Sequence, residues 1–290
     1  MTLRVAACQY SIDLIETWDA YAHSLMTLCR DAADKGAQLL VLPEYSAMVL
    51  TGQLPPDLRS DLHGSLKAMQ PLIPRFVELS EEIARNLGVY LVNGSAPVLD
   101  GDGLYRNRAW FFGPDGLIGT QDKLMMTRFE REQWNISGGK GLTLFETPIG
   151  RFGILICYDN EFPMLARTLS EGGADMILAP SCTDKEAGYF RVRVGAQARA
   201  LENQIAVLVS PTVGSAPWSP AVDENVGRAA LYVPSDYGMP ASGVFAESAE
   251  LQPRESRWLI TDIDLSEVRR LRHEGQVATN RDWPEQFERI

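Results

Sequence analysis

Short apolar runs alternate along this chain with stretches in which apolar residues recur every three or four positions. Residues 3–9 form the first apolar run, which is typical of a buried strand. The following apolar residues keep the spacing of one helix face, and they are Trp18, Tyr21, Ala22, Leu25, Leu28, Cys29 and Ala32. Gly36 stands where a helix commonly ends, and residues 38–42 (QLLVL) are short and aliphatic enough for a strand covered on both faces. The chain therefore opens with a strand-helix-strand unit.

The same alternation continues to the C-terminus. The periodicity predicts a helix over 73–87 that stops at Gly88, and then a strand within 89–98. A turn rich in proline and glycine at 113–116 divides residues 108–122 into a hairpin. The later elements are expected as strands at 152–156, 176–179 and 205–210, helices at 163–172 and 189–203, a strand and a helix within 257–272, and an irregular tail over 276–290.

No low-complexity segment or linker rich in proline and serine interrupts this series. Alternating strands and helices without such a break favour one α/β domain over two. We therefore expect a single domain over residues 1–290, with a core over about 1–265 and a C-terminal helix and tail over 266–290.

The composition narrows the classes of partner. Apolar residues make up 45% of the chain and charged residues 22%, which is typical of a compact globular protein. The 27 basic and 38 acidic side chains give a net charge of −11. An acidic surface repels phosphate backbones, and no basic cluster interleaved with aromatic residues offsets it. Small molecules are therefore the expected partners, and nucleic acid is not.

Histidines and cysteines lack the spacing of metal or disulfide frameworks. The three histidines are scattered, and no pair has zinc-ligand spacing. Four cysteines lie far apart without a CxxC pair, which indicates reduced thiols in a cytoplasmic protein; they are Cys8, Cys29, Cys157 and Cys182. The N-terminal apolar stretch is too short and polar for a signal peptide, and no apolar run reaches the ~20 residues of a membrane span. We expect a cytoplasmic protein without a metal site or membrane partner.

Reactive side chains follow several predicted strands directly. Functional groups gather at the C-terminal ends of strands in open α/β sheets. Glu44 follows the strand 38–42, Cys157 follows 152–156, Cys182 follows 176–179, and Lys123 ends the hairpin. Each also has a simpler interpretation: a polar loop residue for Glu44, a solvated side chain for Lys123, and small hydrophobic residues for the cysteines.

Position separates Cys157 from the other cysteines. Cys8 falls in a strand and Cys29 on an apolar helix face, which predicts core positions for both. Cys157 lies between a strand and a helix that begins at Pro163, where backbone N–H groups and the helix dipole are expected to lower a thiol pKa. No suitably placed histidine accompanies this thiol. A desolvated carboxylate could accept its proton, and an ammonium group could stabilise an oxyanion, so Glu, Lys and Cys together suffice for acyl transfer.

Three segments in this order carry a family resemblance: LVLPEYS, DKLMMTRFE and GILICYDNEFP. They resemble the Glu-Lys-Cys signature of the nitrilase, or carbon-nitrogen hydrolase, superfamily. Further similarity lies in RVAACQ, in the hairpin, in residues 199–203 (RALEN) and in WLITDIDL, so the resemblance spans roughly 250 residues. It implies an α-β-β-α four-layer sandwich and homodimers or higher oligomers. It also implies cofactor-free hydrolysis of a non-peptide C–N bond in a small amide or N-carbamoyl compound.

The resemblance assigns roles to individual residues. Glu44 would be the general base, Lys123 the oxyanion stabiliser and Cys157 the nucleophile, with the Tyr158 backbone N–H completing the oxyanion hole. Many members have a further glutamate after the lysine that orients substrate, and Glu130 is the candidate here. Two alternatives to that assignment stay open: the auxiliary residue could be Glu132, and Glu130 could be an exposed loop carboxylate.

Two further residues concern the substrate. Glu161 stands where many relatives have a basic residue, in Cys-Tyr-Asp-x-Arg-Phe-Pro. If Glu161 faces the pocket, it would disfavour carboxylate-bearing substrates and tolerate neutral or amine-bearing ones; the alternative is a glutamate that only meets a helix dipole. Cys182 is a candidate pocket-lining residue, and Asp159 is expected to support its loop.

The same motifs leave other functions open. A nitrilase would use the same residues through a thioimidate, and an acyltransferase would pass the thioester acyl group to an amine or alcohol. A catalytically silent binding module is the third alternative. A separation of more than about 8 Å between any two of Glu44, Lys123 and Cys157 would favour that module, because proton transfer needs near contact.

Overall fold

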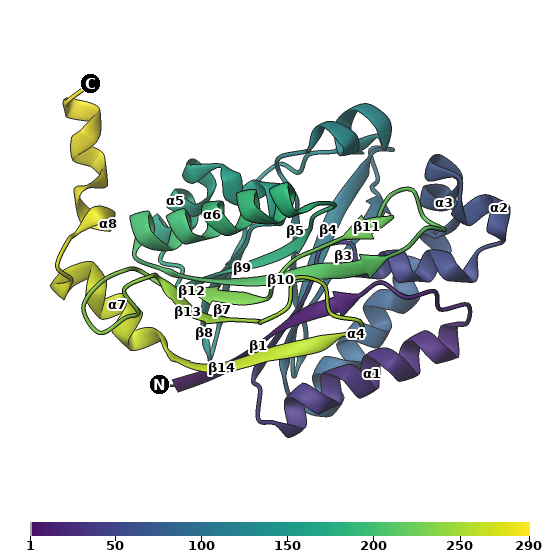
Figure 1. Ribbon diagram of the computed structural model, residues 1–290, viewed down its shortest axis with the longest axis horizontal. Helices are drawn as coiled ribbons and strands as arrows, with labels where there is room; N and C mark the ends of the chain where they lie inside the picture. The colour runs from purple at the N-terminus through teal and green to yellow at the C-terminus, as the bar shows by residue number, and fades with distance from the viewer. Residues whose placement is uncertain (1) are drawn as a thin grey trace.

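The computed structural model describes residues 2–290 and shows two β-sheets that face each other between two layers of helices (Figure 1). The first sheet has the order β5-β4-β3-β2-β1-β14. Its strands are β1 (Thr2–Ser11), β2 (Leu39–Leu42), β3 (Tyr90–Leu99), β4 (Tyr105–Gly113), β5 (Gly116–Asp122) and β14 (Arg257–Asp264), and the short β6 (Ile136–Ser137) pairs with β4. β1, β2 and β3 run parallel to one another. β4 pairs antiparallel with β3, β5 pairs antiparallel with β4, and β14 pairs antiparallel with β1.

The second sheet continues from the first where β1 meets β10 over two residue pairs. Its strands are β7 (Leu144–Thr147), β8 (Gly150–Ile154), β9 (Met176–Cys182), β10 (Ala206–Ser215), β12 (Ala230–Tyr232) and β13 (Val244–Glu247), and β11 (Glu224–Asn225) pairs with the end of β10. β8, β9 and β10 are parallel to one another. Parallel strands need covering on both faces, and the helices and the opposite sheet provide that cover.

Side-chain alternation in β1 and β2 explains the layering. Leu3, Val5 and Ala7 pack into the core between the sheets, whereas their neighbours Ala6 and Cys8 pack toward helices of the first layer. The main helices of that layer are α1 (Trp18–Asp34) and α4 (Ile73–Leu87), and those of the opposite layer are α5 (Pro163–Glu171) and α6 (Glu186–Asn203). The four-layer α-β-β-α arrangement expected from the sequence is confirmed.

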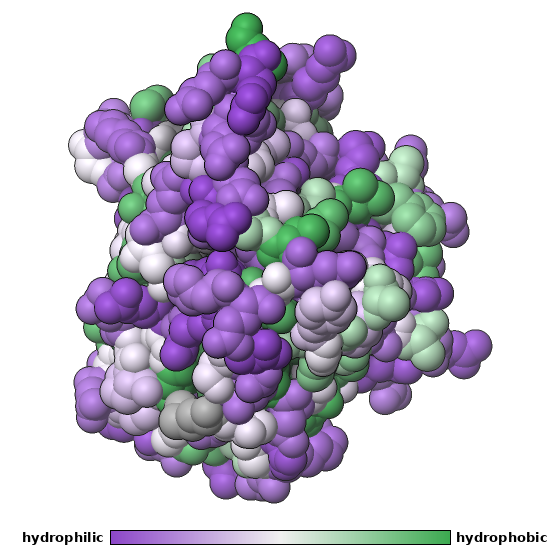
Figure 2. Space-filling model, turned by 90° about the vertical axis from the view of Figure 1, so that its left-hand side faces the viewer, coloured by the Kyte–Doolittle hydropathy of each residue, from purple (hydrophilic) through white to green (hydrophobic). Residues whose placement is uncertain are grey.

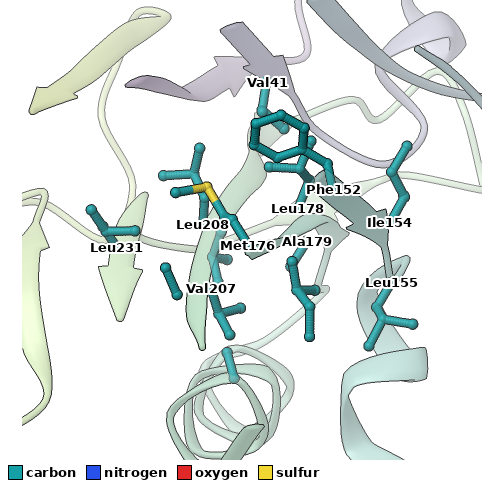
Figure 3. Close-up of a cluster of buried hydrophobic side chains, with 14 of the residues drawn as sticks. Val41, Phe152, Ile154, Leu155, Met176, Leu178, Ala179, Val207, Leu208 and Leu231 are labelled. Carbon is teal, nitrogen blue, oxygen red and sulfur yellow. The ribbon is translucent and has the colours of Figure 1, made fainter. Parts of the chain in front are cut away.

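The core between the sheets is dense and apolar. Val41 of β2 lies beside Phe152 and Leu178 of the second sheet, and Val207 and Ala179 point toward the helix below them (Figure 3). All of these side chains are fully buried. A rigid core of this kind fixes the ends of β2, β8 and β9, from which the candidate site residues project.

Several short elements complete the chain. They are η1 (Ser46–Gln53), α2 (Pro56–Arg59), α3 (Leu62–Ala68), η2 (Gln70–Leu72), the π-helical turn η3 (Phe129–Gln133), the 3-10 turn η4 (Cys157–Glu161), α7 (Leu265–Glu274), α8 (Thr279–Asp282) and η5 (Trp283–Glu288). None of the helices within residues 2–290 is long and apolar enough to cross a membrane. The face that carries the C-terminal segment is largely hydrophilic, with apolar side chains in small separate areas (Figure 2).

The C-terminal tail differs from its predicted irregular form. Residues 279–288 form α8 and η5, which extend from the body of the molecule (Figure 1). Contacts with α5 and α6 account for the difference. The Arg167 guanidinium donates to the Asn280 carbonyl oxygen at 2.8 Å and lies 5.3 Å from the centre of the Trp283 ring, and the Asn280 side chain donates to the Asn203 carbonyl oxygen at 3.0 Å. Tertiary partners of this kind leave no periodic signal in a sequence.

The bounds of the other elements agree with the predicted bounds to within a few residues. α4 has the predicted bounds, and Gly88 ends it with a positive φ of 66°. α6 begins at Glu186, three residues before its predicted start, and β8 ends at Ile154 because the chain turns into the loop before Cys157. Cys8 and Cys29 lie fully buried in the core, as predicted, and all four cysteines are free.

Candidate active site

The predicted site residues converge on one cavity. Its volume is about 610 Å³, and it opens beyond the ends of β2, β8 and β9. Seven of the residues that line it were predicted from the sequence, namely Glu44, Lys123, Glu130, Cys157, Tyr158, Glu161 and Cys182. The structure therefore brings together side chains that lie up to 138 positions apart in the sequence.

Glu44 follows β2 at a tightly constrained turn. Tyr45, the next residue, has a positive φ of 58°, and its backbone N–H donates to the Ser95 hydroxyl at 2.9 Å. β3 packs closely on this turn at Gly94, where a Cβ would collide with the Pro43 carbonyl oxygen. The Thr212 hydroxyl of β10 donates to the Glu44 carbonyl oxygen at 2.7 Å. Contacts from both sheets thus hold the backbone from which the Glu44 side chain projects.

Lys123 follows β5 and points into the cavity as a buried ammonium. Its backbone N–H donates to the Asn107 carbonyl oxygen at 2.8 Å. Its Nζ donates to Glu44 Oε1 at 2.7 Å and to Glu130 Oε1 and Oε2 at 2.8 and 2.7 Å. Burial alone would lower the pKa of Lys123, but the two carboxylates raise it well above its ordinary value. The lysine therefore remains charged at neutral pH.

Glu130 lies on η3 and is buried, which removes its interpretation as an exposed loop residue, whereas Glu132 is exposed. Its carboxylate accepts hydrogen bonds from the Tyr45 hydroxyl at 2.7 Å and from the Thr127 N–H and hydroxyl at 2.9 and 2.8 Å. Burial opposes ionisation, but Lys123 and these donors outweigh it and lower the pKa of Glu130. Glu130 is therefore a lasting anion that fixes the lysine.

Glu44 has the opposite electrostatic character. Burial raises its pKa to about 7, and the nearby Glu130 charge adds to this effect, while Lys123 and a hydrogen bond with the Cys157 thiol reduce it. The Asn107 side chain also donates to Glu44 Oε1, at 2.8 Å. A carboxyl group with a pKa close to neutral can both accept and return a proton under physiological conditions. This balance suits a general base.

Cys157 begins η4 with a positive φ of 50°. Its Sγ lies 3.5 Å from the Cys182 carbonyl oxygen, and the thiol is close enough to the Glu44 carboxyl group to lower the pKa of Glu44. The sequence-based expectation of a lowered thiol pKa was wrong: burial and the Glu44 charge raise the pKa of Cys157 well above its ordinary value, despite Lys123. The physical reason is that η4 separates the thiol from the start of α5 at Pro163. Cys157 is thus a neutral thiol that needs a base.

Several supporting residues were not predicted from the sequence. Tyr45, Thr127 and Asn107 hold the two glutamates. Tyr45 and Thr127 lie within LVLPEYS and DKLMMTRFE, but nothing in those segments indicates which side chains they contact. Cys182 lines the cavity, and its thiol donates to Asn225 Oδ1 at 3.0 Å. Asn225 comes from β11, which no pattern predicted.

Charged side chains ring the opening of the cavity. We call this ring the rim, and it comprises Arg128, Glu161, Asp184, Arg191, Asp223 and Glu224. These residues are exposed or half-buried, unlike Glu44, Lys123 and Glu130. Glu161 lines the cavity but also pairs with Arg191 at 3.4 Å. Four acidic and two basic residues leave a net rim charge of 2 − 4 = −2.

Comparisons with known proteins identify the family of this chain. The carbon-nitrogen hydrolase family model matches residues 4–273. The chain is 33% identical to the probable hydrolase YhcX of Bacillus subtilis over 97% of its length, but spans only 53% of that protein. It is 30% identical to the omega-amidase NIT2 of Danio rerio, covering 88% of this chain and 86% of the relative.

Solved structures show the same fold at lower identity. Nit3 of Saccharomyces cerevisiae, a nitrilase-superfamily member, superimposes with a TM-score of 0.72 at 22% identity, covering 93% of both chains. The amidase of Nesterenkonia AN1 superimposes with a TM-score of 0.67 at 19% identity, covering 97% of both chains. At these identities the likeness establishes the fold.

Proposed function

Because the chain belongs to the carbon-nitrogen hydrolase family, we propose that it hydrolyses a small amide or N-carbamoyl compound through a thioester on Cys157. The observation that carries the proposal is the buried cluster in which Lys123 Nζ lies 2.7 Å from Glu44 Oε1, and in which Glu44 and Cys157 lie close enough for each to shift the pKa of the other. A base, a cation and a nucleophile thus meet at one point.

The first half of the reaction forms the thioester. Glu44 takes the thiol proton as Cys157 Sγ attacks the carbonyl carbon, and the electron pair of the C=O bond moves onto oxygen. Lys123 and the Tyr158 backbone N–H stabilise this oxyanion. Lys123 now donates all three protons to carboxylates, so it exchanges one of its two bonds to Glu130 for the oxyanion. The C–N bond then breaks, and protonated Glu44 gives its proton to the leaving nitrogen.

The second half returns the enzyme to its starting state. Glu44 accepts a proton from water as the water oxygen attacks the thioester carbonyl carbon. The C–S bond breaks, the acid leaves, and the proton returns to Cys157 Sγ. A covalent intermediate divides one difficult displacement into two easier steps. An adduct of the acetamide moiety of fluoroacetamide on the active-site cysteine, seen in a mutant of the Nesterenkonia amidase, is consistent with a nucleophilic role for Cys157.

A substrate panel tests the reaction class. Small amides, N-carbamoyl amines and nitriles would be incubated with the protein, and ammonia release and the intact protein mass would be followed. We expect ammonia from amides or carbamoyl compounds and an acyl adduct on the protein. Acid formation from nitriles alone would identify a nitrilase, acyl transfer to an added amine in place of water would identify an acyltransferase, and no turnover or adduct would favour a binding module.

The catalytic rate is expected to rise with pH through about 7. Burial raises the pKa of Glu44 to about 7, and only its carboxylate form can take the thiol proton. From pH 7 down to pH 6, kcat/KM should fall about tenfold per pH unit, as for loss of one essential base. The measurement is kcat/KM against pH with a neutral amide. A profile that stays flat down to pH 5 would contradict the role of Glu44.

The rim is expected to select substrates by charge. Its net charge of −2 should attract an amine at the far end of an amide and repel a carboxylate. We expect kcat/KM for an ω-amino amide to exceed that for the matching carboxylate-bearing amide by about tenfold, with the neutral alkyl amide between them. Added salt should reduce the difference, because the rim is exposed.

Variants locate the source of this preference. D223N combined with E224Q should remove most of the preference while leaving turnover of the neutral amide unchanged. E186Q removes a nearby charge that does not line the cavity, and it should preserve the preference. Faster turnover of the carboxylate-bearing amide by the unaltered protein would overturn the prediction, including the contribution proposed for Glu161.

Self-association in a homodimer or higher oligomer stays a prediction. α6 presents exposed apolar side chains at Phe190, Val194 and Leu201, which could pack against a second copy. Sedimentation velocity on the full chain would measure the oligomeric state.

A further inference from the structure

Asp159 is a buried carboxylate that the proposed reaction does not use. It lies in η4, two residues after Cys157, and is fully buried. No lysine or arginine forms a salt bridge with it among residues 2–290. A buried charge is costly unless hydrogen bonds replace its hydration. The hydrogen-bond donors that contact Asp159 therefore indicate the role of this carboxylate.

Three backbone N–H groups supply those hydrogen bonds. Asp159 Oδ2 accepts from the Ile156 N–H at 3.1 Å, next to the nucleophile. Asp159 Oδ1 accepts from the Leu124 and Met125 N–H groups at 3.1 and 2.8 Å, directly after Lys123. In the described part of the chain, the Asp159 carboxylate is the acceptor of every hydrogen bond between residues 123–130 and residues 155–162. One side chain thus connects the lysine segment to the cysteine turn.

The opposite side of the turn is anchored separately. The Asn160 side chain donates to the Leu155 and Cys157 carbonyl oxygens at 2.9 and 3.2 Å, and Arg199 of α6 donates to the Asn160 carbonyl oxygen at 3.0 Å. These bonds fix the turn on the second sheet and its helices, whereas Lys123 follows a strand of the first sheet. Without Asp159, the lysine segment would stay attached to the first sheet and the cysteine turn to the second sheet. The position of one segment relative to the other would be less constrained.

We propose that Asp159 is a positioning residue that sets the distance between the Lys123 ammonium and the Cys157 sulfur by holding both segments on one carboxylate. This inference rests on the proposed function. Donors must lie 2.7–3.1 Å from the developing oxyanion to stabilise it, and an error of ~1 Å in placement costs about 10²-fold in rate. Asp159 acts on the transition state through Lys123 and Cys157, without touching substrate.

The test compares D159A and D159N in the full-length protein with a neutral amide. D159A should lower kcat about 10²-fold and change KM less than threefold, because the missing bonds act on the transition state. D159N keeps one oxygen acceptor and should lose about tenfold. D175N is the matched control: Asp175 is also buried and accepts the Arg151 N–H at 2.9 Å, but it lies outside the cavity lining. It should lower the melting temperature and leave kcat unchanged.

The pH profile supplies a second readout. Burial raises the pKa of Asp159 to about 6, while Lys123, the charged group that faces it, and the three N–H donors oppose this rise. In the unaltered protein, kcat/KM should therefore fall more steeply below pH 6 than between pH 6 and 7, as Asp159 and Glu44 both gain protons. D159N should show the shallower one-proton slope throughout.

The outcomes separate the two proposals. Absence of amide turnover by the unaltered protein would refute the proposed function itself. If the unaltered protein hydrolyses the amide, but folded D159A and D159N have the same kcat as D175N, only the positioning role of Asp159 is refuted. If D159A does not fold, as judged by circular dichroism, the kcat and pH slope of D159N decide the question.

Discussion

Replacement of Cys157 by alanine is expected to abolish amide hydrolysis, with a loss of at least ~10⁴-fold in kcat. The thiol is the nucleophile of the proposed reaction, and neither Glu44 nor Lys123 can form a thioester in its place. The alanine side chain fits the space left at the start of η4, so the fold should persist. Ammonia release measures the loss of turnover, and intact mass after incubation with substrate should show no acyl adduct.

Two other cysteines provide controls for that experiment. Cys29 lies fully buried on α1, away from the cavity, and C29A should retain turnover. Cys182 lines the cavity beside Cys157, and C182S should still form an adduct because Cys157 is intact. Turnover that survives in C157A, or an adduct that disappears only in C182S, would show that the nucleophile is misassigned.

The physical origin of each signal explains which elements could be predicted. The layers of the fold follow from local patterns: alternation in β1 and the helical period of α4 reflect faces that each element buries. The tail at 279–288 lacks such a pattern, because its helical turns depend on contacts from Arg167 and Asn280. Long-range hydrogen bonds can order a segment whose own sequence is uninformative.

The candidate site shows the same division. Glu44, Cys157 and Cys182 could be located because they follow predicted strands, and strand ends of parallel sheets meet at one edge. Their pKa values depend on burial and on Glu130, whose contact with Lys123 requires the turn η3. The sequence therefore indicated that a desolvated carboxylate could act as the base, but it gave the wrong pKa direction for Cys157, where the intervening turn decides the environment.

Replacement of Glu44 by glutamine should separate the two halves of the reaction. The amide keeps the shape of the side chain, and its oxygen can still accept from Asn107 and Lys123, but it cannot take a proton from the thiol or from water. Amide turnover should fall at least ~10³-fold. An activated aryl ester has a leaving group that needs no protonation, so slow acylation of Cys157 should survive. Since hydrolysis of the thioester also needs the base, the acyl-enzyme should accumulate and be visible by intact mass.

The charge environment makes this result specific to Glu44. Glu130 already accepts hydrogen bonds from Lys123, Tyr45 and Thr127, and its lowered pKa makes it a poor proton acceptor. It should therefore be unable to replace Glu44, although both carboxylates contact the same ammonium. E132Q alters the exposed neighbour of Glu130 and should keep turnover within about twofold of the unaltered protein. If E44Q releases the ester acyl group at the rate of the unaltered protein, another group activates water. Glu44 would then only hold Lys123 in place.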